Sequence, residues 1–548
     1  MSRTRRLALV PVAHPSSIAF GAALAALLAA ALPAAGATVA LPEPAGAAAL
    51  KDDPGVQEAL HLLDRWLEAQ QDYEDIPALS AAVVHDQELV WSAGYGHANP
   101  ETGAAASPET IYSICSVSKL FTAVAVMTLY DEGKLRLDDE LGDLLPWFEI
   151  RQAYAGSGPI TLARALSHSA GLPREADFPY WTGPEYGFPT GEEIRSRLAG
   201  QETLYPAADV FQYSNLGLTL AGDVVAEVSG VPYDEYVRSR ILEPLGMSRT
   251  TTEIPLEERG KAMALGYGAP DRDGERALMS PFQARGIAPA AGFASTVEDL
   301  ARFASWQFRV LGGDRGGDHG GDHGGDHGGE HEILKPSTLR EMQRLHWDDD
   351  VTDATWGIGF QRWKNGDVQM VGHGGYCPGY RTSFALDPKN EIAVIVMVSA
   401  LDANPTAVAN QAHRLVRPEI VAATGAGAGA GETEGEGEGE GEGKGEGTRE
   451  EGEESAVDLA EYAGVYVRGE GGGEQLVAPR DGDLVVMFLP TDSPAEGLTK
   501  LRHQEGDTFR VVRDNGDLAD PVAFRRDGEG KVVEMCQFQN CARRVEGR

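Results

Sequence analysis

The stretch Ile111-Tyr112-Ser113-Ile114-Cys115-Ser116-Val117-Ser118-Lys119-Leu120-Phe121-Thr122-Ala123 places a serine three residues before a lysine. Residues three apart share one face of a helix, so Lys119 can lie beside Ser116 in a helix that we expect from Ser116 to about Gly133. A serine hydroxyl attacks only when a neighbouring base takes its proton. The free N–H groups and the dipole of a helix start also favour negative charge there. The sequence therefore indicates Ser116 as a nucleophile.

Two further segments complete a recognisable order. Tyr213-Ser214-Asn215 and His373-Gly374-Gly375 follow the first motif along the chain. Together the three motifs resemble those of the serine β-lactamase and penicillin-binding-protein superfamily, in particular its class-C-like branch, the S12-type serine hydrolases. That branch includes D-alanyl-D-alanine carboxypeptidases, D-aminopeptidases, esterases and class C β-lactamases.

Flanking segments extend the resemblance to roughly residues 55–415. They are Leu-Ser-His-Ser-Ala-Gly-Leu-Pro at 166–173, Glu-Pro-Leu-Gly-Met at 243–247 and Trp-Gly-Ile-Gly-Phe at 356–360. The resemblance implies an α/β (α+β) fold with an antiparallel sheet flanked by helices and a helical subdomain. Local patterns agree with this, since helical or strand periodicity occurs in the expected order. The expected helices are 53–71 and 406–416, and the expected strands are 78–84, 89–94, 369–371, 383–386 and 392–398.

The resemblance also implies catalytic roles. Ser116 would form an acyl-enzyme while Lys119 and Tyr213 share the work of the general base. We expect Lys119 and His373 to lower the pKa of Tyr213, so that its phenolate forms near neutral pH. The backbone N–H groups of Ser116 and Tyr376 would bind the oxyanion.

The same resemblance assigns substrate-binding residues. Asn215 would hydrogen-bond the backbone amide of the substrate, and Gly374 and Gly375 would bind the substrate as well. Arg381 could bind a substrate carboxylate, and a surface or structural ion pair is its alternative role. His373 stands where β-lactamases usually carry the lysine of a Lys-Thr-Gly motif. A histidine is a weaker fixed cation at neutral pH, which disfavours strong binding of a β-lactam carboxylate.

The four cysteines suggest two pairs. Cys115 precedes the nucleophile and Cys377 follows Tyr376. Certain class A carbapenemases carry a disulfide between the equivalent positions, so the resemblance implies a Cys115–Cys377 bond, with two small buried thiols as the alternative. Cys536 and Cys541 are expected to pair across a carboxy-terminal hairpin.

The amino-terminus has the pattern of an export signal. Arg3, Arg5 and Arg6 precede an apolar run over 18–32 and a small-residue cleavage site at 35–37. We therefore predict a signal peptide over 1–37 and a periplasmic or secreted protein, a compartment in which disulfides persist. The alternative is a membrane anchor left uncleaved. The run is short for a transmembrane helix, so no stable membrane insertion is expected.

The remaining chain divides by composition. We expect a linker over 38–53, a hydrolase domain over 54–423, a Gly/Glu-rich linker over 424–455 and a β-rich domain over 456–548. The last domain reads as a small antiparallel barrel, and its start at 459–466 resembles the lipocalin-like domain attached to many S12-type hydrolases.

A Gly-Gly-Asp-His repeat within 312–332 could hold a metal ion, but its glycines favour a disordered loop. The formal charge of −37 disfavours nucleic acid as a partner.

The motifs therefore predict an exported serine hydrolase that acts on small peptides, including D-amino-acid or peptidoglycan-type ones, or on carboxylic esters. The mechanism requires neither a metal nor an organic cofactor. A β-lactamase is the alternative within the enzyme class. A non-catalytic binding or scaffold protein that retains the fold is the alternative outside it.

Overall fold

The computed structural model describes residues 50–312, 333–349, 354–425, 457–469, 473–489, 498–513 and 516–546. The predicted signal peptide, nearly all of the Gly/Asp/His loop and most of the Gly/Glu-rich linker lie outside these ranges. Residues from Gly46 onward form one compact unit. None of the helices within the described ranges has the length and apolar character needed to cross a bilayer.

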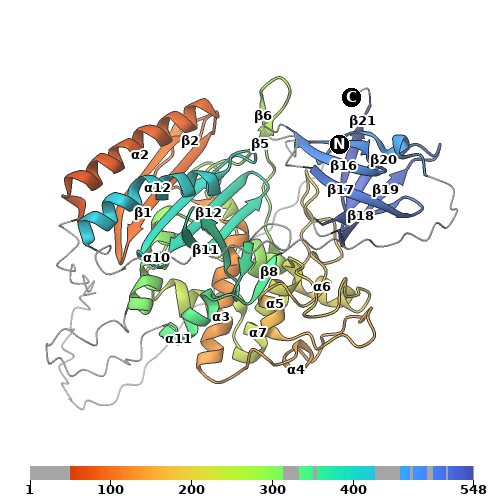
Figure 1. The fold of residues 1–548 in the computed structure, drawn as a ribbon, viewed down its shortest axis with the longest axis horizontal. Coiled ribbons are helices and arrows are strands. Elements are labelled where there is room, and N and C mark those ends of the chain that lie inside the picture. The colour runs from red at the N-terminus through yellow and green to blue at the C-terminus, as the bar shows by residue number, and fades with distance from the viewer. Residues whose placement is uncertain are drawn as a thin grey trace, which may run out of the picture. The chain divides into compact units, whose positions relative to one another are not determined.

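A nine-stranded antiparallel sheet organises the residues up to 425 (Figure 1). The strand order is β3-β2-β1-β13-β12-β11-β10-β9-β8, so the first strands pair with strands from the far end of this segment. The bounds are β1 Ala78–His85, β2 Glu88–Asn99, β3 Ala104–Ala105, β8 Trp347–Asp349, β9 Ala354–Trp356, β10 Gln361–Asn365, β11 Val368–Cys377, β12 Tyr380–Asp387 and β13 Ile392–Val398. The observed order confirms the predicted sheet, and most of the strands are longer than predicted.

Each face of the sheet packs against a different apolar cluster. Successive strand residues point to opposite faces, so in β13 Ile395 packs in one apolar cluster while Val394 and Val396 pack in another. The second cluster includes the apolar faces of α2 (Pro54–Tyr73) and α12 (Pro405–Thr424), which lie side by side in Figure 1. Helix α12 extends beyond the expected 406–416 because its buried face continues through Val416 and Ile420.

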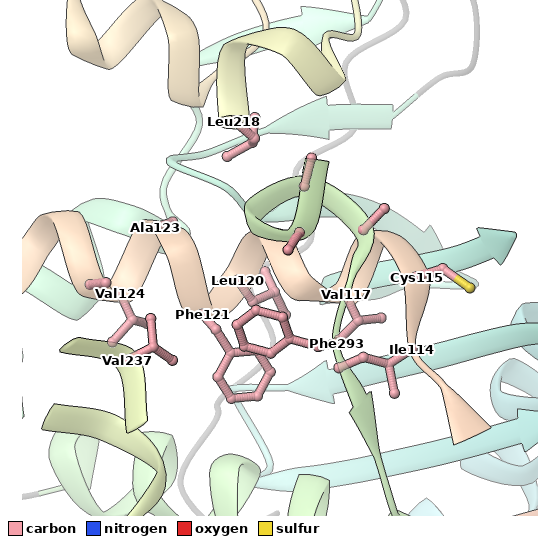
Figure 2. Packing of buried hydrophobic residues seen from close by; sticks show 14 of the residues in the cluster. Ile114, Cys115, Val117, Leu120, Phe121, Ala123, Val124, Leu218, Val237 and Phe293 are labelled. Carbon is pink, nitrogen blue, oxygen red and sulfur yellow. The ribbon is translucent and has the colours of Figure 1, made fainter. Parts of the chain in front are cut away.

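The first cluster covers the other face and includes the helical subdomain. Its central helix, α3, is buried from Ser118 through Leu129, as expected of a helix that is apolar on every side. Figure 2 shows Phe121 of this helix packed near Phe293, and their ring centroids are 5.2 Å apart. The helices are α3 Ser118–Asp131, α4 Leu141–Leu144, α5 Leu162–Leu166, α6 Gly191–Leu198, α7 Asn215–Ser229, α8 Tyr233–Val237, α9 Ala288–Ala291, α10 Val297–Gly312 and α11 Pro336–Gln343.

Two short strand pairs connect these elements, formed by β4 Tyr112–Ser113 with β7 Ala294–Ser295 and by β5 Tyr267–Pro270 with β6 Arg276–Leu278. They were not among the strands predicted from the sequence.

The carboxy-terminal residues form a closed eight-stranded antiparallel barrel, as predicted. Its core contains Tyr466, Leu484, Phe509 and Phe524. The strands are β14 Gly464–Val467, β15 Glu474–Arg480, β16 Asp483–Leu489, β17 Leu498–Glu505, β18 Thr508–Val512, β19 Leu518–Arg526, β20 Val532–Gln537 and β21 Asn540–Val545.

Candidate active site

Ser116 lies in a 3₁₀ turn, Cys115–Val117, and helix α3 begins only at Ser118. The helix was predicted to begin at Ser116, and the difference has a local cause. Cys115 adopts a left-handed conformation with φ of +50°, which interrupts a regular helix start. Ser118 stabilises the turn because its hydroxyl donates to the carbonyl of Cys115 and accepts from the N–H of Phe293. The turn leaves Ser116 partly exposed in front of a buried helix.

Lys119 is completely buried in the first turn of α3. Its Nζ lies 3.2 Å from Oγ of Ser116, 2.7 Å from Oδ1 of Asn215 and 2.8 Å from the carbonyl oxygen of Ala290. The amide and carbonyl oxygens can only accept hydrogen bonds, so each takes one N–H of Lys119. A neutral amine then has its lone pair left for the third neighbour, the hydroxyl of Ser116.

The electrostatic surroundings favour this neutral form. Burial lowers the pKa of Lys119 well below its ordinary value. Glu175 raises that pKa and Arg174 lowers it, and both effects are smaller than that of burial. Burial thus favours the neutral form of an amine that lies in contact with a serine hydroxyl, which is the arrangement that can activate a nucleophile.

Tyr213 lies two residues before α7 and faces the same serine. Its ring centroid is 4.9 Å from Nζ of Lys119 and 4.9 Å from the guanidinium of Arg174. The ring of His168 stacks on it at 4.3 Å. Nδ1 of His168 also accepts a hydrogen bond from the N–H of Ser214, so this histidine fixes the Tyr213 loop.

The expectation of an acidified Tyr213 is wrong. Burial raises the pKa of Tyr213 to about 12, although a hydrogen bond with Ser116 and the charge of Arg174 oppose the shift. His373 cannot supply the expected positive charge, because burial lowers its own pKa to about 3. Tyr213 is therefore a protonated phenol, with a proton to donate near neutral pH.

The glycines after His373 let strand β11 approach the nucleophile. A Cβ on Gly375 would lie 2.4 Å from the carbonyl oxygen of Ile114, so only glycine fits this contact. The disulfide between Cys115 and Cys377 joins the same two segments, with Cα atoms 5.6 Å apart. It confirms the pairing implied by the family resemblance. The Cys536–Cys541 bond is also present.

The predicted residues meet at one cavity of about 680 Å³. Lys119 lies beneath the cavity, and the others line it: Ser116, Tyr213, Asn215, His373, Gly374, Gly375, Tyr376 and Arg381. The barrel supplies part of the wall through residues that include Arg468, Arg513 and Asp520. A hydrogen bond joins the barrel to the wall of the cavity, because Oδ1 of Asn540 accepts from the N–H of Trp181 at 2.7 Å.

The buried acid Glu175 was not among the residues predicted from the sequence. Nδ2 of Asn215 donates to its two carboxylate oxygens at 2.8 and 3.1 Å, while Oδ1 of Asn215 accepts from Lys119. Both ends of the Asn215 amide are thus engaged by protein groups, and its predicted contact with a substrate amide stays a prediction. Tyr180 also donates to Glu175, and Arg174 lies 3.4 Å from it. The signal available was an Arg-Glu pair directly after the 166–173 segment.

We expect the carboxylate of Glu175 to hold Asn215, and through it the amine of Lys119. Glu175→Leu leaves Nδ2 of Asn215 without its acceptor and should lower kcat/KM for any hydrolysed ester by about 10- to 100-fold. Glu175→Gln keeps an acceptor but removes the charge that raises the Lys119 pKa. Its pH–rate profile should therefore rise at a lower pH than that of the wild type. The exposed Glu192→Gln is the matched control, and a Glu175→Leu variant of unchanged activity would contradict the assignment.

The fold and the Ser–Lys–Tyr cluster define a protein of the penicillin-binding and β-lactamase type. The Beta-lactamase family model matches residues 63–419, and the chain belongs to this family of serine hydrolases.

Among similar proteins, "Beta-lactamase-like protein 2" of Dictyostelium discoideum is 31% identical over 37% of this chain and 37% of its own length. "Penicillin-binding protein 4" of Amycolatopsis lactamdurans is 30% identical over 42% of this chain and 58% of its own. The chain thus spans less than two thirds of these curated relatives. The solved octameric penicillin-binding protein homologue of Pyrococcus abyssi is 22% identical, with a TM-score of 0.55 over 87% of this chain and 98% of its own, and shows the same fold.

Proposed function

We propose that the protein is a serine hydrolase that forms an acyl-enzyme at Ser116 with small peptides, including D-amino-acid or peptidoglycan-type ones, or with carboxylic esters. One observation carries the proposal: the buried Nζ of Lys119 has acceptors for its two N–H bonds and lies 3.2 Å from Oγ of Ser116.

The chemistry follows from the protonation states. Lys119 takes the proton of Ser116 as Oγ bonds to the carbonyl carbon, and the carbonyl oxygen becomes an oxyanion bound by the N–H groups of Ser116 and Tyr376. When the tetrahedral intermediate collapses, the protonated Tyr213 gives its proton to the departing nitrogen or oxygen. The Lys119 ammonium returns a proton to Tyr213. In the second half-reaction these proton transfers run in reverse. A water molecule gives up a proton and bonds to the acyl carbon, Ser116 takes a proton back as its ester bond breaks, and the carboxylic acid is released.

Two features separate the proposal from its rivals. Burial lowers the pKa of His373 to about 3, so position 373 lacks the cation with which the lysine of a Lys-Thr-Gly motif would attract the carboxylate of a β-lactam. This favours peptides and esters over β-lactams. A buried lysine beside a serine costs free energy of folding, which a pure binding or scaffold protein would have no reason to retain.

We also propose that the protein works outside the reducing cytosol. All four cysteines are paired in two disulfides, and such bonds persist in oxidising compartments. The basic and apolar amino-terminal pattern supports a periplasmic or secreted location.

The test is intact mass spectrometry after incubation with a labelled penicillin, together with turnover of a chromogenic ester. Ser116→Ala should lose ester turnover by about 10³-fold or more and carry no adduct. The exposed Ser196→Ala serves as the control and should behave as wild type. A lasting wild-type adduct would support peptidase-like chemistry, and rapid loss of β-lactam absorbance would make the protein a β-lactamase. Unchanged ester turnover in Ser116→Ala would refute the assigned nucleophile.

A further inference from the structure

The barrel contacts the hydrolase domain at the segment that leads into Tyr213. The hydroxyl of Tyr205 donates to the carbonyl oxygen of Leu518 at 3.0 Å, and the guanidinium carbon of Arg513 lies 5.5 Å from the centroid of the Tyr205 ring. Nη2 of Arg513 also donates to the carbonyl oxygen of Phe211 at 2.5 Å. Leu518 and Arg513 belong to the barrel, so the barrel is hydrogen-bonded to the chain just before the tyrosine of the active site.

Arg513 is itself held in place on the barrel side. It directly follows β18, where its N–H donates to the carbonyl of Asp517 and its carbonyl accepts from the N–H of Gly516, both at 2.9 Å. The residue is only 7% exposed. A buried guanidinium is stable only when its N–H groups and its charge have partners, and a charged donor makes a stronger hydrogen bond than a neutral one. The contact with Phe211 is therefore a strong link that starts from a fixed turn.

A second barrel residue contacts the next position of the same segment. Burial raises the pKa of the Asp520 carboxyl in β19, and a hydrogen bond with Gln212 and the charge of Arg513 are among the effects that oppose the rise. Nε2 of Gln537 also donates to Asp520, at 3.2 Å. The barrel thus holds two consecutive residues of the hydrolase domain, and Tyr213 is the residue that follows them.

The contact of Arg513 also completes the hydrogen bonding of one peptide unit. Phe211 supplies the C=O of its peptide bond to Gln212, and the N–H of the same bond donates to the carbonyl oxygen of His168 at 2.8 Å. The hydrolase domain holds one polar group of this unit, and the barrel holds the other. Because the unit is planar, the two hydrogen bonds fix its rotation, and that rotation sets the direction in which the chain enters Tyr213.

We propose that Arg513 is a positioning residue for Tyr213, so that the barrel acts on the reaction through the segment 211–213. The inference rests on the proposed function, in which Tyr213 gives its proton to the departing atom. A proton transfer requires the donor to lie within hydrogen-bond distance of its acceptor. Rotation of the peptide before Tyr213 would therefore slow the departure of the leaving group more than the attack of Ser116.

A series of butyrate esters that share one acyl group provides the test, with leaving groups from 4-nitrophenol to ethanol. 4-Nitrophenol is acidic enough to leave as its anion, whereas ethanol leaves only with a proton from a donor. We expect Arg513→Met to lower kcat/KM by about 10- to 100-fold for the ethyl ester and by less than about 3-fold for the 4-nitrophenyl ester. Arg513→Lys keeps a charged donor and should recover part of the loss.

A double variant shows whether Arg513 acts through Tyr213. Tyr213→Phe should produce the same dependence on the leaving group, with a larger loss on the ethyl ester. The losses in Arg513→Met/Tyr213→Phe should then not add, because both substitutions damage one step. Additive losses would mean that Arg513 acts elsewhere and would overturn the inference.

Controls separate positioning from the docking of the barrel. Tyr205→Phe removes a hydrogen bond of the same interface, and Arg480→Gln changes an exposed arginine of β15. Both should leave the ratio of the ethyl and 4-nitrophenyl rates within about 2-fold of the wild type.

The remaining outcomes also decide. Equal losses on both esters in Arg513→Met would show that Arg513 only stabilises the barrel and would overturn the inference. Should Arg513→Met fail to fold, Arg513→Gln takes its place, and failure of both to fold would overturn the inference as well. A wild type that hydrolyses none of the esters would instead overturn the proposed function on which the inference rests.

Discussion

Lys119→Met is expected to lower kcat/KM for ester hydrolysis by about 10³-fold or more, because it removes the group that takes the proton of Ser116. Methionine has a similar length and is apolar, so it fits the buried position of Lys119. It leaves the acceptors on Asn215 and Ala290 unpaired, at a cost of about 1–3 kcal/mol each. A circular dichroism melt will show that the variant folds, and steady-state kinetics will measure the loss.

A second substitution tests whether Lys119 acts as a base. Lys119→Arg introduces a fixed cation, because a guanidinium stays protonated and has no lone pair for Ser116. It should therefore be as inactive as Lys119→Met. An active Lys119→Arg enzyme would contradict the role of Lys119 as a base and would transfer that role to Tyr213.

The pH dependence of the wild type follows from the same contacts. Burial lowers the pKa of Lys119, and only the neutral amine can accept the proton of Ser116. Activity should therefore rise with pH through that lowered pKa, at a lower pH than an ordinary lysine would require. Tyr213 acts as the acid, so activity should fall again only as pH approaches its raised pKa of about 12.

The elements that could be predicted from the sequence are those in which short segments determine the structure. The continuous apolar runs of Ile392–Val398 and of α3 specify buried elements locally, and the Ser116, Tyr213 and His373 motifs identify their own positions. The Cys115–Cys377 bond followed from a resemblance whose motifs bring those segments together.

Sequence could not predict effects that arise only from packing. The pKa of Tyr213 moves upward because the folded chain removes water from it, a change of environment that no local motif records. Glu175 contacts Asn215 although 40 positions separate them in the sequence, and Arg468 of the barrel lines the same cavity as the much earlier Ser116. Such contacts between distant segments require the tertiary structure.

Removal of the Cys115–Cys377 bond should produce the largest stability loss among simple substitutions. The bond closes a loop with a sequence separation of 262, and the chain-entropy model gives about 5.6 kcal/mol for a loop of that length. The matched control is the Cys536–Cys541 bond, whose separation of 5 gives about 2 kcal/mol in the same model. Urea unfolding of Cys115→Ala/Cys377→Ala and of Cys536→Ala/Cys541→Ala will compare them.

The first pair should also affect catalysis, because it joins the Ser116 turn to strand β11. That turn includes a non-glycine residue with a positive φ, and the contact of Gly375 with Ile114 is its other close tie to the strand. Without the bond the proposed oxyanion donors at Ser116 and Tyr376 would lose their fixed separation, so kcat should fall by about 10-fold or more while KM changes little. The control pair should leave kcat unchanged. Equal stability losses in both double variants, or full activity without the first bond, would show that packing alone holds the turn.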